Sequence, residues 1–341
     1  MRLSGCIRTS EELWDLLINK RTTRSKVPPN LFNIARFYSQ IEVAGTMPID
    51  EVHSLSDDDP RDAFDIYFSM SKKEVEAIDP QQKMLLECRW RSWLGLANRV
   101  SYVLDFRGPS CTVRTASIHS GECDSAVVAG TNLIFFPELY LSMSSQGVLA
   151  KYGGCKTFDS TAVGFCHGQG IAAVYVKALK DCGTDTVRSV IRSTASNSLI
   201  RRAYRQAALG PSDTAYFVAH GTGIKTGDLI ECEAISGLFD EAGGLFLGSI
   251  KPNLGHGEGV AGITSVIAAS LALEHSTIPS NINFNKLKPT IAPNKATIEI
   301  PTEPAARPAS YSRPVYVNSF GVGGSYCHRS FETLPFSSIS P

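Results

Sequence analysis

The chain has 341 residues, and its 33 basic residues balance 33 acidic residues, so the formal net charge at pH 7 is zero. This balance argues against non-specific nucleic-acid binding, which depends on excess positive charge. The sequence has no apolar run long enough to span a bilayer and no signal-peptide core at its start, which predicts a cytoplasmic protein without membrane contact. Nine cysteines without a pair at zinc-ligand spacing favour reduced thiols and no metal site.

The chain begins with a segment typical of a short amphipathic helix, at residues 9–19. A threonine at its start can cap the first turn, and two glutamates in that turn favour the positive end of the helix dipole. Two consecutive prolines at 28 and 29 interrupt regular structure, and the segment from there to about residue 69 is polar and loop-like.

The later elements are predicted from apolar runs and the glycines that flank them. We expect a buried strand at 120–132 and an apolar helix at 260–273, whose small side chains allow it to pack close to a sheet. Residues 315–320 are expected to form the last strand, followed by a tight turn at 321–324. Further predicted elements are strands at 171–176 and 187–191 and a helix at 199–204.

Two histidines follow apolar, strand-like runs, and glycines flank both. His220 follows the run 214–219, and His256 follows the run 245–250 together with Lys251. Strand ends that lead into glycine-rich turns are where open α/β sheets place their chemistry. Two imidazoles and an ammonium can donate hydrogen bonds to an acyl oxygen or a carboxylate and can move a proton near neutral pH. The alternative is that each is an ordinary, hydrogen-bonded loop histidine.

Three motifs in a fixed order carry a resemblance to a known family. They are His220-Gly-Thr-Gly with Gly-Asp228 after it, Lys251-x-Asn-x-Gly-His256, and Ser319-Phe-Gly-Val-Gly-Gly324. Together they resemble the signature of β-ketoacyl synthases, and more narrowly the ketosynthase domain of fungal iterative type I polyketide synthases. The similarity extends from about Arg2 to Glu332.

The resemblance implies a thiolase-like α/β fold with layered α-β-α-β-α order. The chain would then divide into an N-terminal half, 1–154, and a C-terminal half, 155–341, that carries the histidine and lysine motifs. Family members form homodimers. Stretches expected of the family are missing between Trp93 and Leu96, after Ala116 and after Asn197, so the N-terminal half should be incomplete.

The resemblance also assigns roles to the motif residues. The parent reaction is the decarboxylative Claisen condensation of acyl and malonyl thioesters, carried on the phosphopantetheine of an acyl carrier protein, with no bound cofactor. By resemblance, His220 and His256 would donate hydrogen bonds to the enolate oxygen, and Lys251 would fix the electrostatics around them. Phe320 would shape the acyl path, and the turn containing Val322 and Gly323 would lend a backbone N–H.

The nucleophile motif departs from the family. The chain continues from Thr115-Ala directly to Ser117, where the family has Thr-Ala-Cys-Ser and a buried helix. Ser117 stands at the nucleophile position or is the remnant of the far end of that helix. An unactivated hydroxyl is a poor substitute for a thiolate. Cys111 and Cys123 are expected to pack as small apolar side chains.

Three hypotheses remain for the function. The chain is a condensing enzyme whose missing segments are restored in the true coding sequence; or it decarboxylates malonyl thioesters without a nucleophile; or it is a non-catalytic remnant or partner subunit. Any role in synthesis is expected to require other polyketide synthase domains in trans, because no acyltransferase, reductase or carrier segment is recognisable in the sequence.

Overall fold

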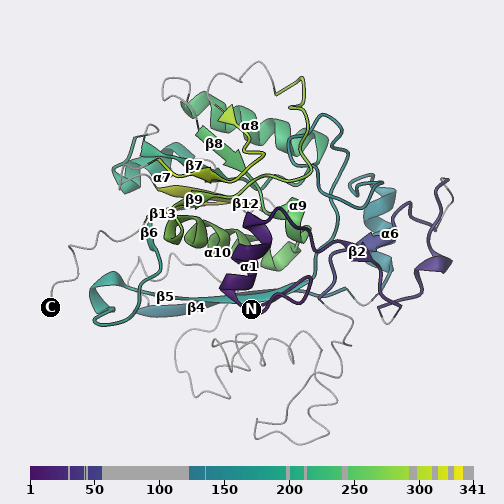
Figure 1. The fold of residues 1–341 in the computed structure, drawn as a ribbon, viewed down its shortest axis with the longest axis horizontal. Helices are drawn as coiled ribbons and strands as arrows, with labels where there is room; N and C mark the ends of the chain where they lie inside the picture. The colour runs from purple at the N-terminus through teal and green to yellow at the C-terminus, as the bar shows by residue number, and fades with distance from the viewer. Residues whose placement is uncertain are drawn as a thin grey trace, which may run out of the picture.

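The computed structural model describes most of the chain. The described ranges are 1–29, 31–41, 43, 45–55, 123–134, 136–196, 200–210, 213–239, 245–291, 298–308, 314–321 and 326–332. Its main elements are a six-stranded sheet, a three-stranded sheet and the helices that cover them. In Figure 1, α10 (Ala261–Glu274) and α1 (Ser10–Ile18) lie between the two sheets, and α8 (Lys225–Phe239) lies beyond the larger sheet.

The six-stranded sheet has the order β10-β8-β7-β12-β13-β6. The three strands β8, β7 and β12 are parallel to their neighbours within this group, whereas β13 is antiparallel to both β12 and β6. The sheet is therefore mixed. Its strands are β6 (Val190–Ser196), β7 (Tyr216–Val218), β8 (Leu245–Gly248), β10 (Ile298–Glu299), β12 (Val315–Phe320) and β13 (Tyr326–Glu332).

Alternate residues of β7 and β12 supply the cores on the two faces of this sheet. Phe217 and Tyr316 pack with residues of α8 and α7 (Ile200–Ala207), whereas Tyr216 and Val317 pack with α10. The helices predicted at 199–204 and 260–273 are thus confirmed, and α10 packs close to the sheet through Ala269 and Ala272, which are fully buried.

The prediction that 315–320 is the last strand is wrong, because β13 follows it. The register pairs Val315 with Phe331 and Asn318 with His328. β13 lacks an apolar alternation because two of its buried residues, His328 and Ser330, are polar. Each has a hydrogen-bond partner, since His328 bonds to Asn318 and Ser330 bonds to Ser193. A polar strand face of this kind leaves no hydrophobic period in the sequence.

The three-stranded sheet is antiparallel, with the order β1-β5-β4. It joins β1 (Arg2–Leu3), β5 (Gly170–Lys177) and β4 (Ser125–Asn132). β5 confirms the strand predicted at 171–176. β4 was predicted to be buried, but residues 126–131 are only half-buried. Among the described residues β4 pairs along one edge alone, with β5.

The predicted N-terminal helix is confirmed as α1. Thr9 caps it and Glu12 completes a capping box, because each side chain accepts a backbone N–H of the other residue. Its buried face, Leu13, Leu16 and Leu17, packs in the cluster that also contains Ile263 of α10. α1 therefore closes one end of the layer between the sheets.

Shorter elements connect these layers. They are β2 (Ser25–Lys26), η1 (Ile34–Arg36), β3 (Glu51–Val52), α6 (Glu138–Ser145), η2 (Leu179–Asp181), α9 (Lys251–Leu254), η4 (Glu258–Val260), β9 (Thr277–Ile278) and β11 (Ala305–Ala306). Among the described residues, none of the helices combines the length and apolar character that crossing a bilayer requires.

We predict that Ala272→Leu destabilises the protein, because Ala272 is fully buried where α10 meets the larger sheet. Overpacking of this kind costs about 1–3 kcal/mol, measurable as a lower midpoint in urea unfolding. The matched control is Ala234→Leu on the exposed side of α8. Equal midpoints for the two variants would contradict the close packing of α10.

Candidate active site

The loop after β7 carries His220 and turns tightly through two glycines. Gly221 and Gly223 have φ of 47° and 85°, in the left-handed region that favours glycine. A Cβ on Gly221 would lie 2.5 Å from Thr157 Cγ2 and 2.8 Å from Ser249 Cβ. The glycine therefore allows the loop to approach its neighbours closely, and this fixes the backbone at His220.

A buried carboxylate on α8 holds this loop. Glu231 accepts the backbone N–H groups of His220 at 2.8 Å and Gly221 at 2.9 Å, and the side-chain amide of Asn318 at 2.9 Å. Burial raises the pKa of Glu231, and these donors oppose that rise. One side chain thereby joins α8, the end of β7 and β12.

A second carboxylate, one turn earlier on α8, supports the loop further along. Asp228 accepts the N–H of Gly223 at 3.0 Å and that of Phe158 at 2.9 Å. Burial raises its pKa to about 6. The spacing of Asp228 and Glu231 places both on one face of the helix, toward the His220 loop.

His256 follows α9 through a sharp turn at Gly255, where φ is 74°. A Cβ there would lie 2.7 Å from His53 Cδ2. The backbone of His256 is fixed from both sides, because its N–H donates to Cys166 O at 2.7 Å and its carbonyl accepts from Gly168 N at 2.9 Å. A chain segment about ninety residues away thus sets the position of this ring.

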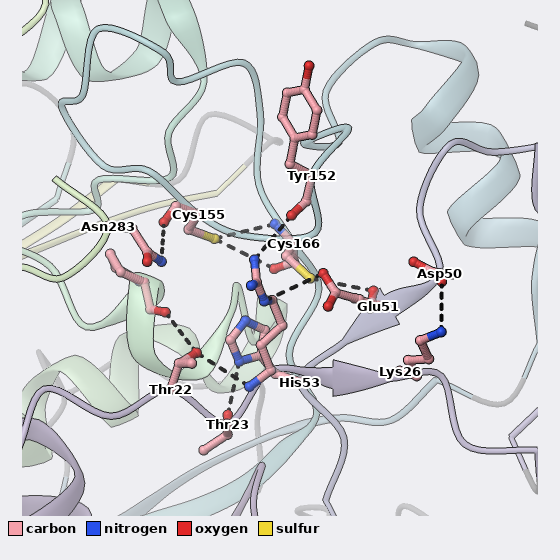
Figure 2. Close-up of polar contacts among 12 residues, drawn as sticks. Thr22, Thr23, Lys26, Asp50, Glu51, His53, Tyr152, Cys155, Cys166 and Asn283 are labelled. Carbon is pink, nitrogen blue, oxygen red and sulfur yellow. Dashed lines mark hydrogen bonds and ion pairs between the residues drawn. The ribbon is translucent and has the colours of Figure 1, made fainter. Parts of the chain in front are cut away.

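Residues near the N-terminus support α9 from behind. Thr23 N and Oγ1 both donate to Asn253 O, at 2.9 and 3.1 Å, and Asn253 Nδ2 donates to Arg21 O at 2.8 Å. Thr23 Oγ1 also lies 2.9 Å from Nδ1 of the buried His53. Figure 2 shows Thr22, Thr23 and His53 grouped on this side. The turn between Lys251 and His256 is therefore held by the N-terminal part of the chain.

The two imidazoles lie close together, with ring centroids 5.3 Å apart and planes at 84°. His220 Nδ1 accepts the backbone N–H of Phe320 at 3.4 Å, and His256 Nδ1 accepts that of Glu258 at 3.2 Å. A neutral imidazole has one donor and one acceptor nitrogen. Because Nδ1 accepts in both rings, the hydrogen is on Nε2 in both, and each ring offers an N–H donor.

Burial keeps these rings neutral. It lowers the pKa of both His220 and His256, and the positive charge of Lys251 lowers them further. Lys251 is itself buried, with 2% of its surface exposed, and burial lowers its pKa to about 8 although Glu231 opposes the shift. At neutral pH the cluster consists of two neutral imidazoles and one ammonium.

Aromatic side chains flank the two histidines. Phe320 lies 5.3 Å from His220, and Phe165 lies 5.0 Å from His256, between ring centroids. Both are apolar surfaces beside N–H donors. Phe320 was predicted from its motif, whereas Phe165 was not; its place in a glycine-rich segment was the available signal.

The structure brings together four of the residues proposed from the motifs: His220, His256, Lys251 and Phe320. Ser117, Val322 and Gly323 lie outside the described residues, and so does Cys111. Within the described ranges, no three histidine, cysteine or carboxylate side chains are grouped closely enough to hold a metal ion.

One buried cysteine lies near this cluster. Cys155 is buried near Lys251, and burial raises the pKa of its thiol to about 11. A thiol in that state is a poor nucleophile. Its Sγ accepts the N–H of Cys166 at 3.3 Å, and Figure 2 shows the two side by side. Cys155 therefore packs in the core and is not a candidate nucleophile.

Three carboxylates at the site were not assigned roles from the sequence. Asp228 was quoted as part of a motif without a function, and Glu231 and Glu258 were not considered. The available signals were the spacing of Asp228 and Glu231 on one helix face and the position of Glu258 two residues after His256.

The sequence that forms this layered fold, with its two neutral histidines and buried lysine, matches a family of condensing enzymes. The family description "Beta-ketoacyl synthase, N-terminal domain" matches residues 1–95 and 94–182, and "Beta-ketoacyl synthase, C-terminal domain" matches 171–285. The chain belongs to the β-ketoacyl synthase family. The N-terminal description matches in two segments that meet at residues 94–95, within the Trp93–Leu96 stretch where family residues were predicted to be missing.

The curated relatives are fungal highly reducing polyketide synthases. The chain is 39% identical over 406 residues to gloL of Glarea lozoyensis and 37% identical over 414 residues to FUM1 of Gibberella moniliformis. These matches cover 96% and 98% of this chain but 16% of each relative, so the chain spans about a sixth of their length. The first alignment has 406 positions, whereas 96% of 341 residues is about 327, which leaves about 80 positions without a counterpart here.

Solved ketosynthase domains share the fold. The oxazolomycin ketosynthase domain OzmH KS7 of Streptomyces albus has a TM-score of 0.88 at 25% identity, covering 95% of this chain and 72% of that one. The ketosynthase from module 6 of the bacillaene synthase of Bacillus subtilis has a TM-score of 0.87 at 26% identity, covering 98% and 71%. The thiolase-like α/β fold is thereby confirmed.

We predict that Glu231→Gln destabilises the protein by about 1–3 kcal/mol, the cost of an unsatisfied buried donor. The amide places one NH2 group where the two carboxylate oxygens now accept three N–H donors from His220, Gly221 and Asn318. Urea unfolding measures the loss. Glu233→Gln, on the exposed side of the same helix, is the control and should match the parent; an equally stable Glu231→Gln would show that this carboxylate does not hold the loop.

Proposed function

We propose that the chain, as its sequence stands, decarboxylates malonyl thioesters through His220, His256 and Lys251. The observation that carries the proposal is the pair of backbone N–H groups that occupy Nδ1 of both histidines. They leave two neutral Nε2–H donors from rings 5.3 Å apart. This is the arrangement needed to hold an oxygen atom that becomes negatively charged during a reaction.

The chemistry follows from where the charge moves. When a malonyl thioester loses CO2, the electrons of the breaking C–C bond form an enolate, and negative charge develops on the thioester oxygen. Fixed donors stabilise that oxygen without reorganisation, and they act strongly in a site with little water. The ammonium of the buried Lys251 adds a positive charge near both rings.

Condensation needs an acyl-enzyme that the sequence does not provide for. Residues 115–120 read Thr-Ala-Ser-Ile-His-Ser, without a cysteine. Without a nucleophile the enolate is not consumed by an acyl group, so it takes up a proton and becomes an acetyl thioester. The family reaction thus stops after its first half.

The substrate would be carried on the phosphopantetheine of an acyl carrier protein. The relatives' printed names, highly reducing polyketide synthases, support a place in polyketide biosynthesis. The chain spans 16% of their length, and we propose an acyl carrier protein and other polyketide synthase domains as its partners. We also propose that the chain consists of two halves, 1–154 and 155–341, and that it forms a homodimer, as in the parent family.

Two alternatives remain, supported by the roughly 80 unmatched alignment positions noted above. A coding sequence that restores Thr-Ala-Cys-Ser at Ala116–Ser117 would make the chain a condensing enzyme, and sequencing the spliced transcript across that junction decides this. A folded protein without activity would be a non-catalytic remnant or partner subunit.

We predict that the protein converts a malonyl carrier thioester to the acetyl thioester, detected by mass spectrometry of the carrier. His256→Ala removes one N–H donor and should slow this conversion about 10²–10³-fold, as loss of an oxyanion donor does. His275→Ala, at an exposed histidine after α10, should leave the rate unchanged. A folded parent protein that forms no acetyl product would refute the proposed activity.

We predict a fall in the decarboxylation rate as pH rises through about 8. Lys251 has its pKa lowered to about 8 by burial, so its ammonium is present below that pH and is lost above it. Arginine stays protonated over this range. Lys251→Arg should therefore lack the alkaline fall, even if its overall rate is lower. A parent profile that stays flat to pH 10 would contradict the role of this charge.

A further inference from the structure

Decarboxylation without condensation requires a proton at carbon. Each turnover turns a malonyl carboxylate into CO2 and leaves an enolate, which becomes an acetyl group only when a C–H bond forms. The Nε2–H groups of His220 and His256 are engaged as oxygen donors. Neutral imidazoles are very weak acids, so neither can supply this proton. Lys251 is 2% exposed and has little access to solvent for reprotonation.

Glu258 is the acidic group attached to the His256 turn. Its backbone N–H donates to His256 Nδ1 at 3.2 Å. Its φ is 43°, in the left-handed region where glycine is favoured. A glutamate in a backbone conformation that suits glycine suggests that the side chain has a use, because the local conformation alone does not favour it.

The carboxyl of Glu258 lies partly inside the protein and partly in solvent. Its Oε1 is buried and lacks a hydrogen-bond partner among the described residues, while 28% of the side chain is exposed. Burial raises its pKa, and the charge of Lys251 opposes the rise. A group of this kind can hold a proton on its buried oxygen and recover one from water at its exposed edge.

His167 faces the buried side of this carboxyl. Its Nδ1 lies 3.6 Å from Glu258 Oε1, the imidazole is fully buried, and neither ring nitrogen has a hydrogen-bond partner among the described residues. The rings of Tyr140 and Phe165 enclose it, at 4.5 and 5.3 Å between centroids. Burial lowers the pKa of His167 to about 4. Burial thus opposes charge on both partners.

We propose, on the basis of the proposed decarboxylation, that Glu258 supplies the proton that converts the enolate to the acetyl group. The O–H bond of the carboxylic acid breaks, the π electrons of the enolate form the new C–H bond, and Glu258 is left as a carboxylate. Water at its exposed edge then returns a proton. One proton is consumed and one CO2 released per turnover. His167 is a positioning residue that keeps the carboxyl turned inward.

The test separates loss of CO2 from protonation of carbon. In a single turnover with a malonyl carrier thioester, Glu258→Gln should release CO2 at a rate close to that of the parent. It should form the acetyl thioester about 10²-fold more slowly, the typical contribution of a general acid. Glu258→Asp should recover part of that rate. Glu233→Gln, at an exposed glutamate of α8, is the matched control and should behave as the parent.

A second measurement uses the reverse proton transfer. With an acetyl carrier thioester in D2O, the parent should exchange methyl protons for deuterium, and Glu258→Gln should lose this exchange by a similar factor. A folded Glu258→Gln variant that keeps both exchange and acetyl formation overturns this inference and leaves the decarboxylation standing. A variant that loses CO2 release and exchange equally also overturns it, because that pattern indicates a structural role. A folded parent that releases no CO2 overturns both.

Discussion

The carboxylate of Glu231 is the interaction on which the geometry of the site depends. It accepts three N–H groups, two from the His220 loop and one from Asn318 of β12. Asn318 in turn lies 2.6 Å from His328 Nδ1 on β13. Burial lowers the pKa of His328 to about 3, so this ring is neutral and donates from Nδ1. Successive hydrogen bonds from His328 to Asn318 and from Asn318 to Glu231 therefore link two strands of the larger sheet to α8. They fix the loop that carries His220 at the end of β7.

The second histidine depends on a different part of the chain. His256 is held by residues 166–168, and the preceding turn packs against His53 and the Thr23 segment. Residues after β7 and α9 therefore supply the donors, whereas Thr23 and His53, from the N-terminal part of the chain, help to set the position of His256. This division explains why the site cannot be assigned to one half of the fold. It also means that residues in the range 1–55 help to hold the turn before His256.

The sequence predicted the elements with a clear period or cap. The capping box of α1 and the small-residue face of α10 are local patterns, and both appear in the structure. β13 was missed because its buried residues His328 and Ser330 are polar, and their hydrogen-bond partners, Asn318 and Ser193, are distant in the sequence. At the site, motif order grouped His220 with His256, but the tautomers follow from the backbone N–H groups of Phe320 and Glu258. Such contacts cannot be inferred from residue types alone.

The hydrogen bonds that fix the two rings come from residues 166–168, 231, 258 and 320. The nucleophile motif would lie at 115–120, in another part of the sequence. Stabilising an enolate and forming an acyl-enzyme therefore depend on separate groups of residues. Loss of the second group leaves donors whose positions and protonation are set by burial and by backbone bonds. The decarboxylation proposed above would need the first group alone, because the enolate would then require only a proton.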